Sequence, residues 1–99
     1  MRVIAWKTLR LFAEKHPLAL EPLKVWCKLI EASDFADPAD IKRLFGRNVD
    51  FLPHNVVIFD VGGNKYRISA SIRYRLNMLF IRDVLTHAEY DRRIKRDRL

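Results

Sequence analysis

The feature that most constrains the fold is a β-hairpin pattern between residues 56 and 72. Val56–Val61 is a run of residues that favour β-strands, and the Gly62-Gly63-Asn64 segment after it contains residue types that accept positive φ in tight turns. Alternating residues then indicate a second strand. One of its faces carries Lys65, Arg67, Ser69 and Ser71, and the other carries Tyr66, Ile68, Ala70 and Ile72. The pattern predicts an antiparallel strand pair.

Two helices are predicted before this hairpin. Apolar residues recur at helical spacing from residue 6 to residue 16, where Pro17 ends the run, and a second helix is expected from about Leu18 to Ala32. Residues 2–5 fit either a first strand or the start of the first helix. Because a proline joins the two helices, they are expected to form an antiparallel helical hairpin.

Further elements complete the prediction. Asp37 fits the N-cap of a short helix to Phe45 that has Pro38 at its first position, and residues 78–84 fit a strand. In that strand Arg82 is predicted to share a face with Met78, Phe80 and Val84. Residues 92–98 fit a short basic helix or a frayed end. The chain is therefore expected to form one α+β domain over residues 1–99, with the helical hairpin packed on a twisted, mainly antiparallel sheet whose other face is partly open.

The charge of the chain favours anionic partners. The net charge is +7, and residues 51–99 carry ten Lys and Arg against five Asp and Glu. The lone Cys27 excludes an internal disulfide and a cysteine-rich zinc site, and His16, His54 and His87 are too far apart in sequence for a metal motif, so neither metal nor cofactor is expected. No run is apolar enough for a signal peptide or a membrane span, which favours the cytoplasm.

The C-terminal half carries groups that suit metal-free cleavage of RNA. Such a reaction needs a base near the 2′-hydroxyl, an acid near the leaving oxygen and cations around the phosphate. His87 and Tyr90 can move protons, Asp91 or Glu89 can orient His87 or act as base, and arginines can hold a phosphate. Structural uses remain open for each: the strand arginines can pair with acidic neighbours, His87 can be a capping residue, and Tyr90 can simply pack.

Two motifs resemble the HigB family of bacterial toxins. They are the segment from Val57 to Arg67, which contains Gly-Gly-Asn, and Ile81-Arg82 followed by Thr86-His87-Ala88-Glu89-Tyr90-Asp91. The resemblance implies a RelE-like fold and a ribosome-dependent endonuclease that cleaves translated mRNA in the A site. It also implies a cognate HigA-like helix-turn-helix antitoxin, through which the toxin reaches operator DNA. The positions carried over as catalytic are Arg67, Arg82, His87, Tyr90 and Asp91. Further RNA contacts are expected from Lys65, Arg73, Arg75, Arg92 and Arg93.

Four positions depart from the family pattern. Asp60 stands where Asn is usual, Ser71 where Lys is common, Phe80 where Tyr is frequent and Asp83 where an apolar residue is usual. The loss of a cation and the gain of acids predict weaker phosphate binding. An alternative function is therefore a protein that binds RNA or the ribosome without cleaving, and that also acts as a co-repressor with its antitoxin.

Overall fold

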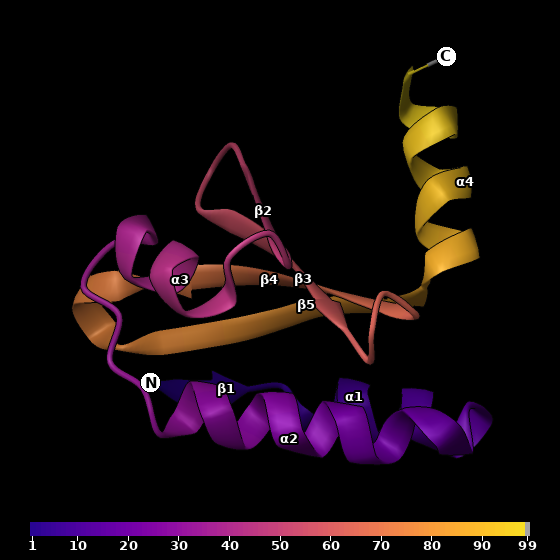
Figure 1. The fold of residues 1–99 in the computed structure, drawn as a ribbon, viewed down its shortest axis with the longest axis horizontal. Coiled ribbons are helices and arrows are strands. Elements are labelled where there is room, and N and C mark those ends of the chain that lie inside the picture. The colour runs from indigo at the N-terminus through magenta and orange to yellow at the C-terminus, as the bar shows by residue number, and fades with distance from the viewer. Residues whose placement is uncertain (99) are drawn as a thin grey trace.

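A computed structural model of the chain describes the backbone of residues 1–98 and the side chains of residues 1–93. Its centre is a five-stranded sheet with the strand order β1-β5-β4-β3-β2 (Figure 1). The strands are β1 (Arg2–Ile4), β2 (Val49–Leu52), β3 (Val56–Val61), β4 (Tyr66–Arg73) and β5 (Met78–Thr86). β1 runs parallel to β5 and the other neighbours are antiparallel, so the predicted α+β class and the β3–β4 hairpin are confirmed.

Two helices cover one face of this sheet (Figure 1). They are α1 (Trp6–Lys15) and α2 (Leu20–Glu31), and the short 3-10 turn η1 (Pro17–Ala19) joins them as the predicted helical hairpin. Their apolar stripes contribute Leu9, Leu23 and Ile30 to the core, where these side chains are almost completely buried with strand residues such as Phe59 and Ile68. Burial of this apolar surface is the main stabilising term for the fold.

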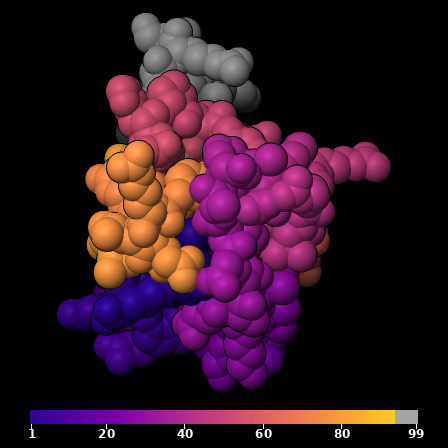
Figure 2. Space-filling view, turned by 90° about the vertical axis from the view of Figure 1, so that its left-hand side faces the viewer, coloured from indigo at the N-terminus to yellow at the C-terminus, as the bar shows by residue number. Residues whose placement is uncertain are grey.

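A third helix closes the core beside β2. α3 (Pro38–Phe45) begins as predicted, because the Asp37 side chain accepts a hydrogen bond from the Asp40 backbone N–H at 3.1 Å. Phe45 packs edge-on against Phe59 with 5.0 Å between ring centroids, and Trp26 of α2 meets the same ring at 5.2 Å. Figure 2 views the end of the molecule where α3 lies near the connection between β4 and β5.

The pairing of β4 and β5 is interrupted by a β-bulge at Arg82. Ser69 pairs with Asp83 and Ala70 pairs with Ile81, so the ladder passes over Arg82. The extra residue shifts the alternation of side chains between the two faces by one position. Val84 is therefore buried in the same core as Ile81. The prediction that Val84 shares a face with Arg82, Met78 and Phe80 is therefore wrong, because periodicity alone assumes a regular strand.

The last helix, α4 (His87–Arg98), starts directly after β5 and leaves the sheet on the side away from α1 and α2 (Figure 1). Thr86 and Glu89 form a capping box at its start. The Thr86 N–H donates to Glu89 Oε1 at 2.9 Å, and the Glu89 N–H donates to Thr86 Oγ1 at 3.2 Å. The basic segment 92–98 continues this helix. Among the described residues, none of the helices combines the length and the apolar character that a membrane crossing requires.

Candidate active site

Arg67 is a buried arginine, only 8% exposed, and its guanidinium is surrounded by acceptors. Nη1 donates to the backbone carbonyls of Asn64 and Tyr66, both at 3.2 Å. Nη2 donates to Asn64 Oδ1 at 2.6 Å and lies 2.8 Å from Nδ1 of His87. Nε lies 3.0 Å from Asp60 Oδ1 as an ion pair, without the alignment of a hydrogen bond. All three guanidinium nitrogens therefore have protein partners.

The Gly-Gly-Asn turn supplies much of this arrangement. Gly62, Gly63 and Asn64 all have positive φ, as the sequence predicts, and Asn64 at +80° turns both its carbonyl and its side-chain oxygen toward Arg67. The same turn holds the start of α4, because the Lys65 carbonyl accepts the His87 backbone N–H at 2.9 Å. The turn thus fixes Arg67 and His87 relative to each other.

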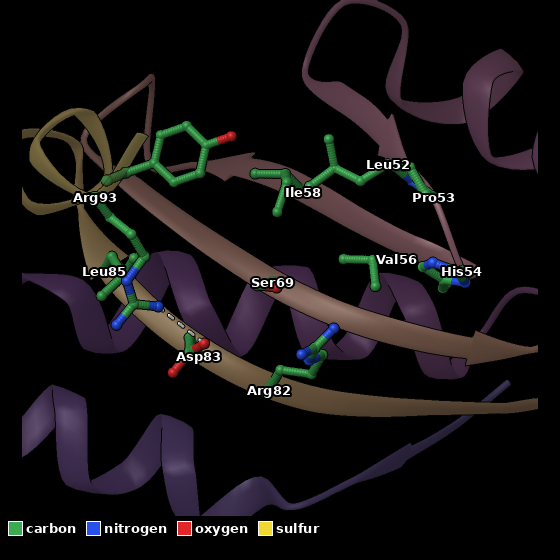
Figure 3. Close-up of a pocket in the computed structure, with 11 residues that line it drawn as sticks. Leu52, Pro53, His54, Val56, Ile58, Ser69, Arg82, Asp83, Leu85 and Arg93 are labelled. Atoms are coloured by element: carbon green, nitrogen blue, oxygen red, sulfur yellow. Dashed lines mark hydrogen bonds and ion pairs between the residues drawn. The ribbon is translucent and has the colours of Figure 1, made fainter. Parts of the chain in front are cut away.

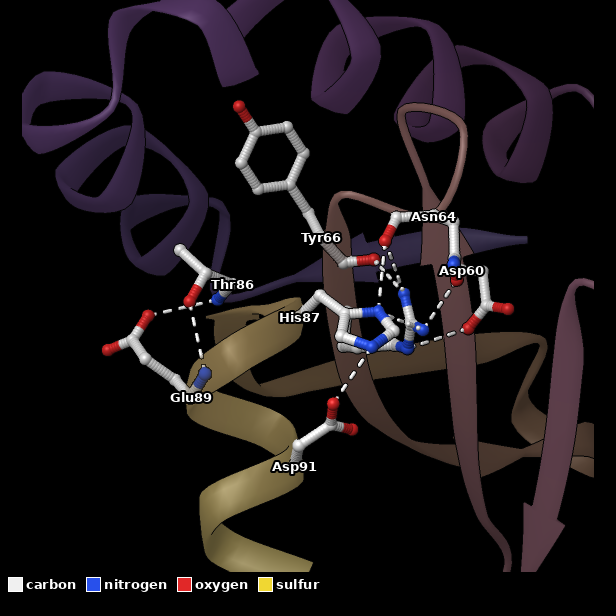
Figure 4. Close-up of polar contacts among 8 residues, drawn as sticks. Asp60, Asn64, Tyr66, Thr86, His87, Glu89 and Asp91 are labelled. Atoms are coloured by element: carbon white, nitrogen blue, oxygen red, sulfur yellow. Dashed lines mark hydrogen bonds and ion pairs between the residues drawn. The ribbon is translucent and has the colours of Figure 1, made fainter.

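His87 is held through both ring nitrogens. Nδ1 faces the Arg67 guanidinium, and Nε2 lies 2.8 Å from Asp91 Oδ2, one helical turn further along α4 (Figure 4). Nδ1 lies 2.8 Å from Arg67 Nη2, a donor, and 3.2 Å from the Asn64 carbonyl, an acceptor. The shorter contact favours the tautomer in which Nδ1 accepts from Arg67 and the Nε2 proton is donated to Asp91. Asp91 is about half exposed, which leaves its carboxylate accessible to a substrate.

Tyr90 lies beside the same guanidinium. The Arg67 Cζ is 5.8 Å from the centre of its ring, within the range of a cation–π contact. Burial raises the pKa of the Tyr90 hydroxyl, and the negative charge of Asp50 on β2 raises it further, while Arg67 lowers it. The hydroxyl is therefore protonated at neutral pH and can donate a proton or a hydrogen bond.

Glu89 has a structural role in this arrangement. It was predicted as an alternative to Asp91 for orienting His87, but its carboxylate caps α4 through Thr86 (Figure 4). The hydrogen bond from the Thr86 N–H is the main cause that lowers the pKa of Glu89. The Thr-x-x-Glu spacing is a helix-start signal in the sequence, and that signal was missed.

A hollow lies on the open face of the sheet, between the β2–β3 hairpin and α4 (Figure 3). Its volume is about 670 Å³, and Tyr90 forms part of its lining and so connects it to the cluster around Arg67. Arg82 points into it from the bulge, and Arg93 of α4 borders it while donating to Asp83 Oδ2 at 3.1 Å (Figure 3). Within residues 1–93 the Arg82 side chain takes part in none of the hydrogen bonds or ion pairs.

The structure brings some predicted site residues together and separates others. Arg67, His87, Tyr90 and Asp91 form one cluster, and Lys65 is exposed in the adjoining turn. Arg82 lies nearby in the hollow, but Arg67 is opposite Leu85 in the ladder rather than opposite Arg82.

The remaining predicted RNA contacts lie outside the cluster. Arg73 and Arg75 are at the opposite end of β4, where Arg73 pairs with Met78, about 20 Å from Arg67 at the usual rise per strand residue. Arg92 is exposed on α4. Residues 1–93 place no three His, Cys, Asp or Glu side chains where they could hold a metal ion together. His16 instead stacks on Phe12 with 4.4 Å between ring centroids.

Comparison with known proteins identifies the family. Residues 19–93 match the HigB_toxin family, described as the RelE-like toxic component of a toxin-antitoxin system. The chain belongs to the HigB toxin family. The mRNA interferase toxin HigB of Escherichia coli K12 is 34% identical over 93 residues, which cover 92% of this chain and 88% of that protein. The mRNA interferase HigB of Escherichia coli O6:H1 is 29% identical over 93 residues, with 93% and 90% covered. The resemblance inferred from the motifs and the RelE-like fold are thus confirmed, and a toxic component of this kind has an antitoxin as partner.

Proposed function

We propose that this protein is an mRNA interferase, an endoribonuclease that cuts translated messages and is neutralised by its antitoxin. The observation that carries the proposal is the Arg67–His87–Asp91 chain of contacts with Tyr90 beside it, in a chain of the HigB family. The curated relatives are named mRNA interferases, which gives the substrate class. The basic character of the chain suits a polyanionic substrate.

In the proposed reaction the 2′-hydroxyl attacks the adjacent phosphate. The exposed carboxylate of Asp91 takes the hydroxyl proton, and Tyr90 gives a proton to the 5′-oxygen that leaves. The products are a 2′,3′-cyclic phosphate and a 5′-hydroxyl. His87 holds Asp91 through Nε2, and Arg67 holds His87 through Nδ1, so Arg67 acts here by positioning. Arg82, whose guanidinium has no partner among residues 1–93, is the cation proposed for the phosphate.

A small cluster of this kind depends on accurate alignment of its substrate. We therefore propose that the ribosomal A site holds the message for cleavage, because a fixed near-attack geometry supplies a large part of the rate. The proposed partner is a HigA-like helix-turn-helix antitoxin that also binds operator DNA, so the toxin reaches DNA only through it. The cytoplasm, where translation occurs, is the proposed location.

Induction of the toxin followed by mapping of mRNA 5′ ends tests the proposal. The parent is expected to produce new ends inside translated codons, and His87→Ala and Tyr90→Phe are expected to lose them. His87→Ala removes the group that holds Asp91, and Tyr90→Phe removes the proposed acid, whose loss costs about 10²–10⁴-fold in rate. His16→Ala is the matched control, because this histidine stacks on Phe12 away from the cluster. Unchanged ends in the His87 and Tyr90 variants would refute the assigned site. Purified toxin incubated with mRNA, with and without ribosomes, tests the ribosome requirement.

A second candidate function is inhibition of translation by binding without cleavage. It is favoured by the charge pairing in the site, where Asp60 faces Arg67 and Asp83 holds Arg93, so that two cations are partly neutralised. This candidate predicts growth arrest with intact messages. Repression of the operator with the antitoxin is compatible with either function, and it predicts that operator affinity changes with the ratio of toxin to antitoxin.

A further inference from the structure

The hollow beside the cluster has an apolar floor that the proposed proton transfers do not use. Val56 and Ile58 of β3, 8% and 3% exposed, lie on the face of the sheet opposite the core, and Leu85 of β5 lines the hollow on the other side of β4 (Figure 3). A volume of about 670 Å³ lies within the range of known ligand sites.

The β-bulge places a cation at the edge of this floor. In a regular strand, consecutive side chains point to opposite faces, but Arg82 and Asp83 both border the hollow while Ile81 and Val84 are buried in the core. Asp83 is engaged by Arg93 at 3.1 Å, whereas Arg82 points inward near Ser69 and Val56 (Figure 3). The site therefore offers an apolar surface and an adjacent guanidinium, the two groups that recognise a base and its phosphate.

The hollow is continuous with the catalytic cluster. Tyr90 contributes to the lining of the hollow and its ring also contacts the Arg67 guanidinium. The width of this one side chain therefore separates the cluster from the hollow along the path of a bound RNA. Arg82 requires a negatively charged group on the ligand. The apolar floor requires a flat apolar group on the same ligand. Single-stranded RNA with an unstacked base satisfies both requirements.

We propose that this hollow binds one nucleotide that flanks the scissile bond, with its base against Val56, Ile58 and Leu85 and its phosphate on Arg82. The proposal rests on the proposed function, because it assumes that RNA is the substrate. It adds a binding subsite that holds the message in register beside the groups that move protons, and it shares Tyr90 and Arg82 with the proposed reaction.

The test uses an RNA that cannot be cut. Short oligoribonucleotides with 2′-O-methyl groups, each with an abasic unit at a different position, are bound to the toxin and also presented to it as the message on a stalled ribosome. For the parent, removal of the base at one position of the RNA should lower the affinity by roughly 5- to 150-fold. That position is called the sensitive position. Ser69→Phe, which fills the hollow from its floor, should bind the intact RNA about as weakly as the parent binds the abasic one and should show no sensitive position.

Ser71→Phe is the matched control for this variant. Ser71 lies on the same face of β4 as Ser69 and is also partly exposed, but it does not line the hollow. A second test variant with a smaller change is Leu52→Ala in the hollow, and its control is Leu44→Ala on α3. The two leucines are matched because both are 46% exposed. We expect weaker binding for the Leu52 variant and unchanged binding for the Leu44 variant, with thermal unfolding measured for all four proteins.

Several results would overturn the proposal. These are the absence of any sensitive position, the same loss in Ser71→Phe, or no binding to either form of the RNA. Retained RNA binding by Ser69→Phe with loss of antitoxin binding would show that the hollow takes a protein segment instead. Because the RNA is resistant to cleavage, the outcome is separate from the proposed nuclease activity, which the mapping of mRNA ends tests independently.

Discussion

Replacement of Arg67 by alanine is expected to lower the free energy of unfolding by about 3 kcal/mol or more, because it leaves a buried acid without its partner. The side chains of Arg67 and Asp60 are only 9% and 18% exposed, so solvent screens their interaction little. The variant also removes the donors that satisfy the Asn64 and Tyr66 carbonyls. A domain of this size has a stability of about 5–15 kcal/mol, so the loss is a large fraction of the total.

Urea denaturation followed by tryptophan fluorescence measures this loss, since Trp26 is buried against Phe59. The midpoint of thermal unfolding should fall by roughly 12–24 °C for a loss of about 3 kcal/mol. Arg73→Ala at the exposed end of the same strand is the control, and it should change stability by less than about 0.5 kcal/mol.

A double-mutant cycle with Asp60→Ala separates the ion pair from the other contacts of Arg67. The double variant should be more stable than the sum of the two single losses predicts, by about 0.5–3 kcal/mol. If Arg67→Ala unfolds like the parent, the buried guanidinium does not stabilise the turn, and the inference that it acts by positioning is refuted. Imidazole ¹⁵N shifts of His87 provide a further check, because the preference for a proton on Nε2 should weaken when the guanidinium is removed.

Three further predictions follow from single residues. Glu89→Gln keeps the capping-box acceptor but removes the negative charge at the start of α4, and should weaken the helix by about 0.3–1 kcal/mol at neutral pH. The pKa of Glu89 is lowered in the folded state, so this advantage is present above the ordinary carboxyl pKa and is lost as the pH falls through the folded value. A difference in helix content between variant and parent that is independent of pH would contradict it. Gly62→Ala should destabilise more than Gly63→Ala in chemical denaturation: both have positive φ, which costs about 1–2 kcal/mol, but only at Gly62 would the new Cβ lie 3.0 Å from a ring carbon of Tyr66. Burial raises the pKa of the Cys27 thiol to about 12, so a thiol reagent at pH 8 should label the chain at the rate of unfolding, and rapid labelling of the native protein would disprove this.

The parts of the fold that depend on local patterns could be predicted from the sequence. The β3–β4 hairpin follows from alternation and from Gly62-Gly63-Asn64, and the start of α3 follows from Asp37 and Pro38. β1 could not be decided, because three residues carry too little periodicity and their pairing with β5 joins segments more than 70 residues apart. β2 was not predicted, because three of its four residues are exposed and the strand is defined by its pairing with β3.

The residues that gather at the candidate site were predicted better than their contacts. His87, Tyr90 and Asp91 were selected correctly as neighbours because one helical turn contains all three. The partners of Arg67 could not be predicted, because they come from a turn, from a strand and from a helix that meet only in the folded chain. The sequence does contain an indication of the bulge. Two consecutive charged residues, Arg82 and Asp83, separate the core residues Ile81 and Val84, which a regular strand would separate by one residue.

The bulge also has a consequence for how this protein can change in evolution. Since the ladder pairs the residues on either side of Arg82 with adjacent residues of β4, the sheet has no structural need for this position. Its side chain is exposed and contributes nothing to the core. Substitutions at Arg82 can therefore change this exposed position with little effect on folding, whereas at Arg67 the atoms that position His87 are also the atoms that stabilise the fold. A variant of altered potency is thus more accessible through Arg82 than through the buried cluster beside it.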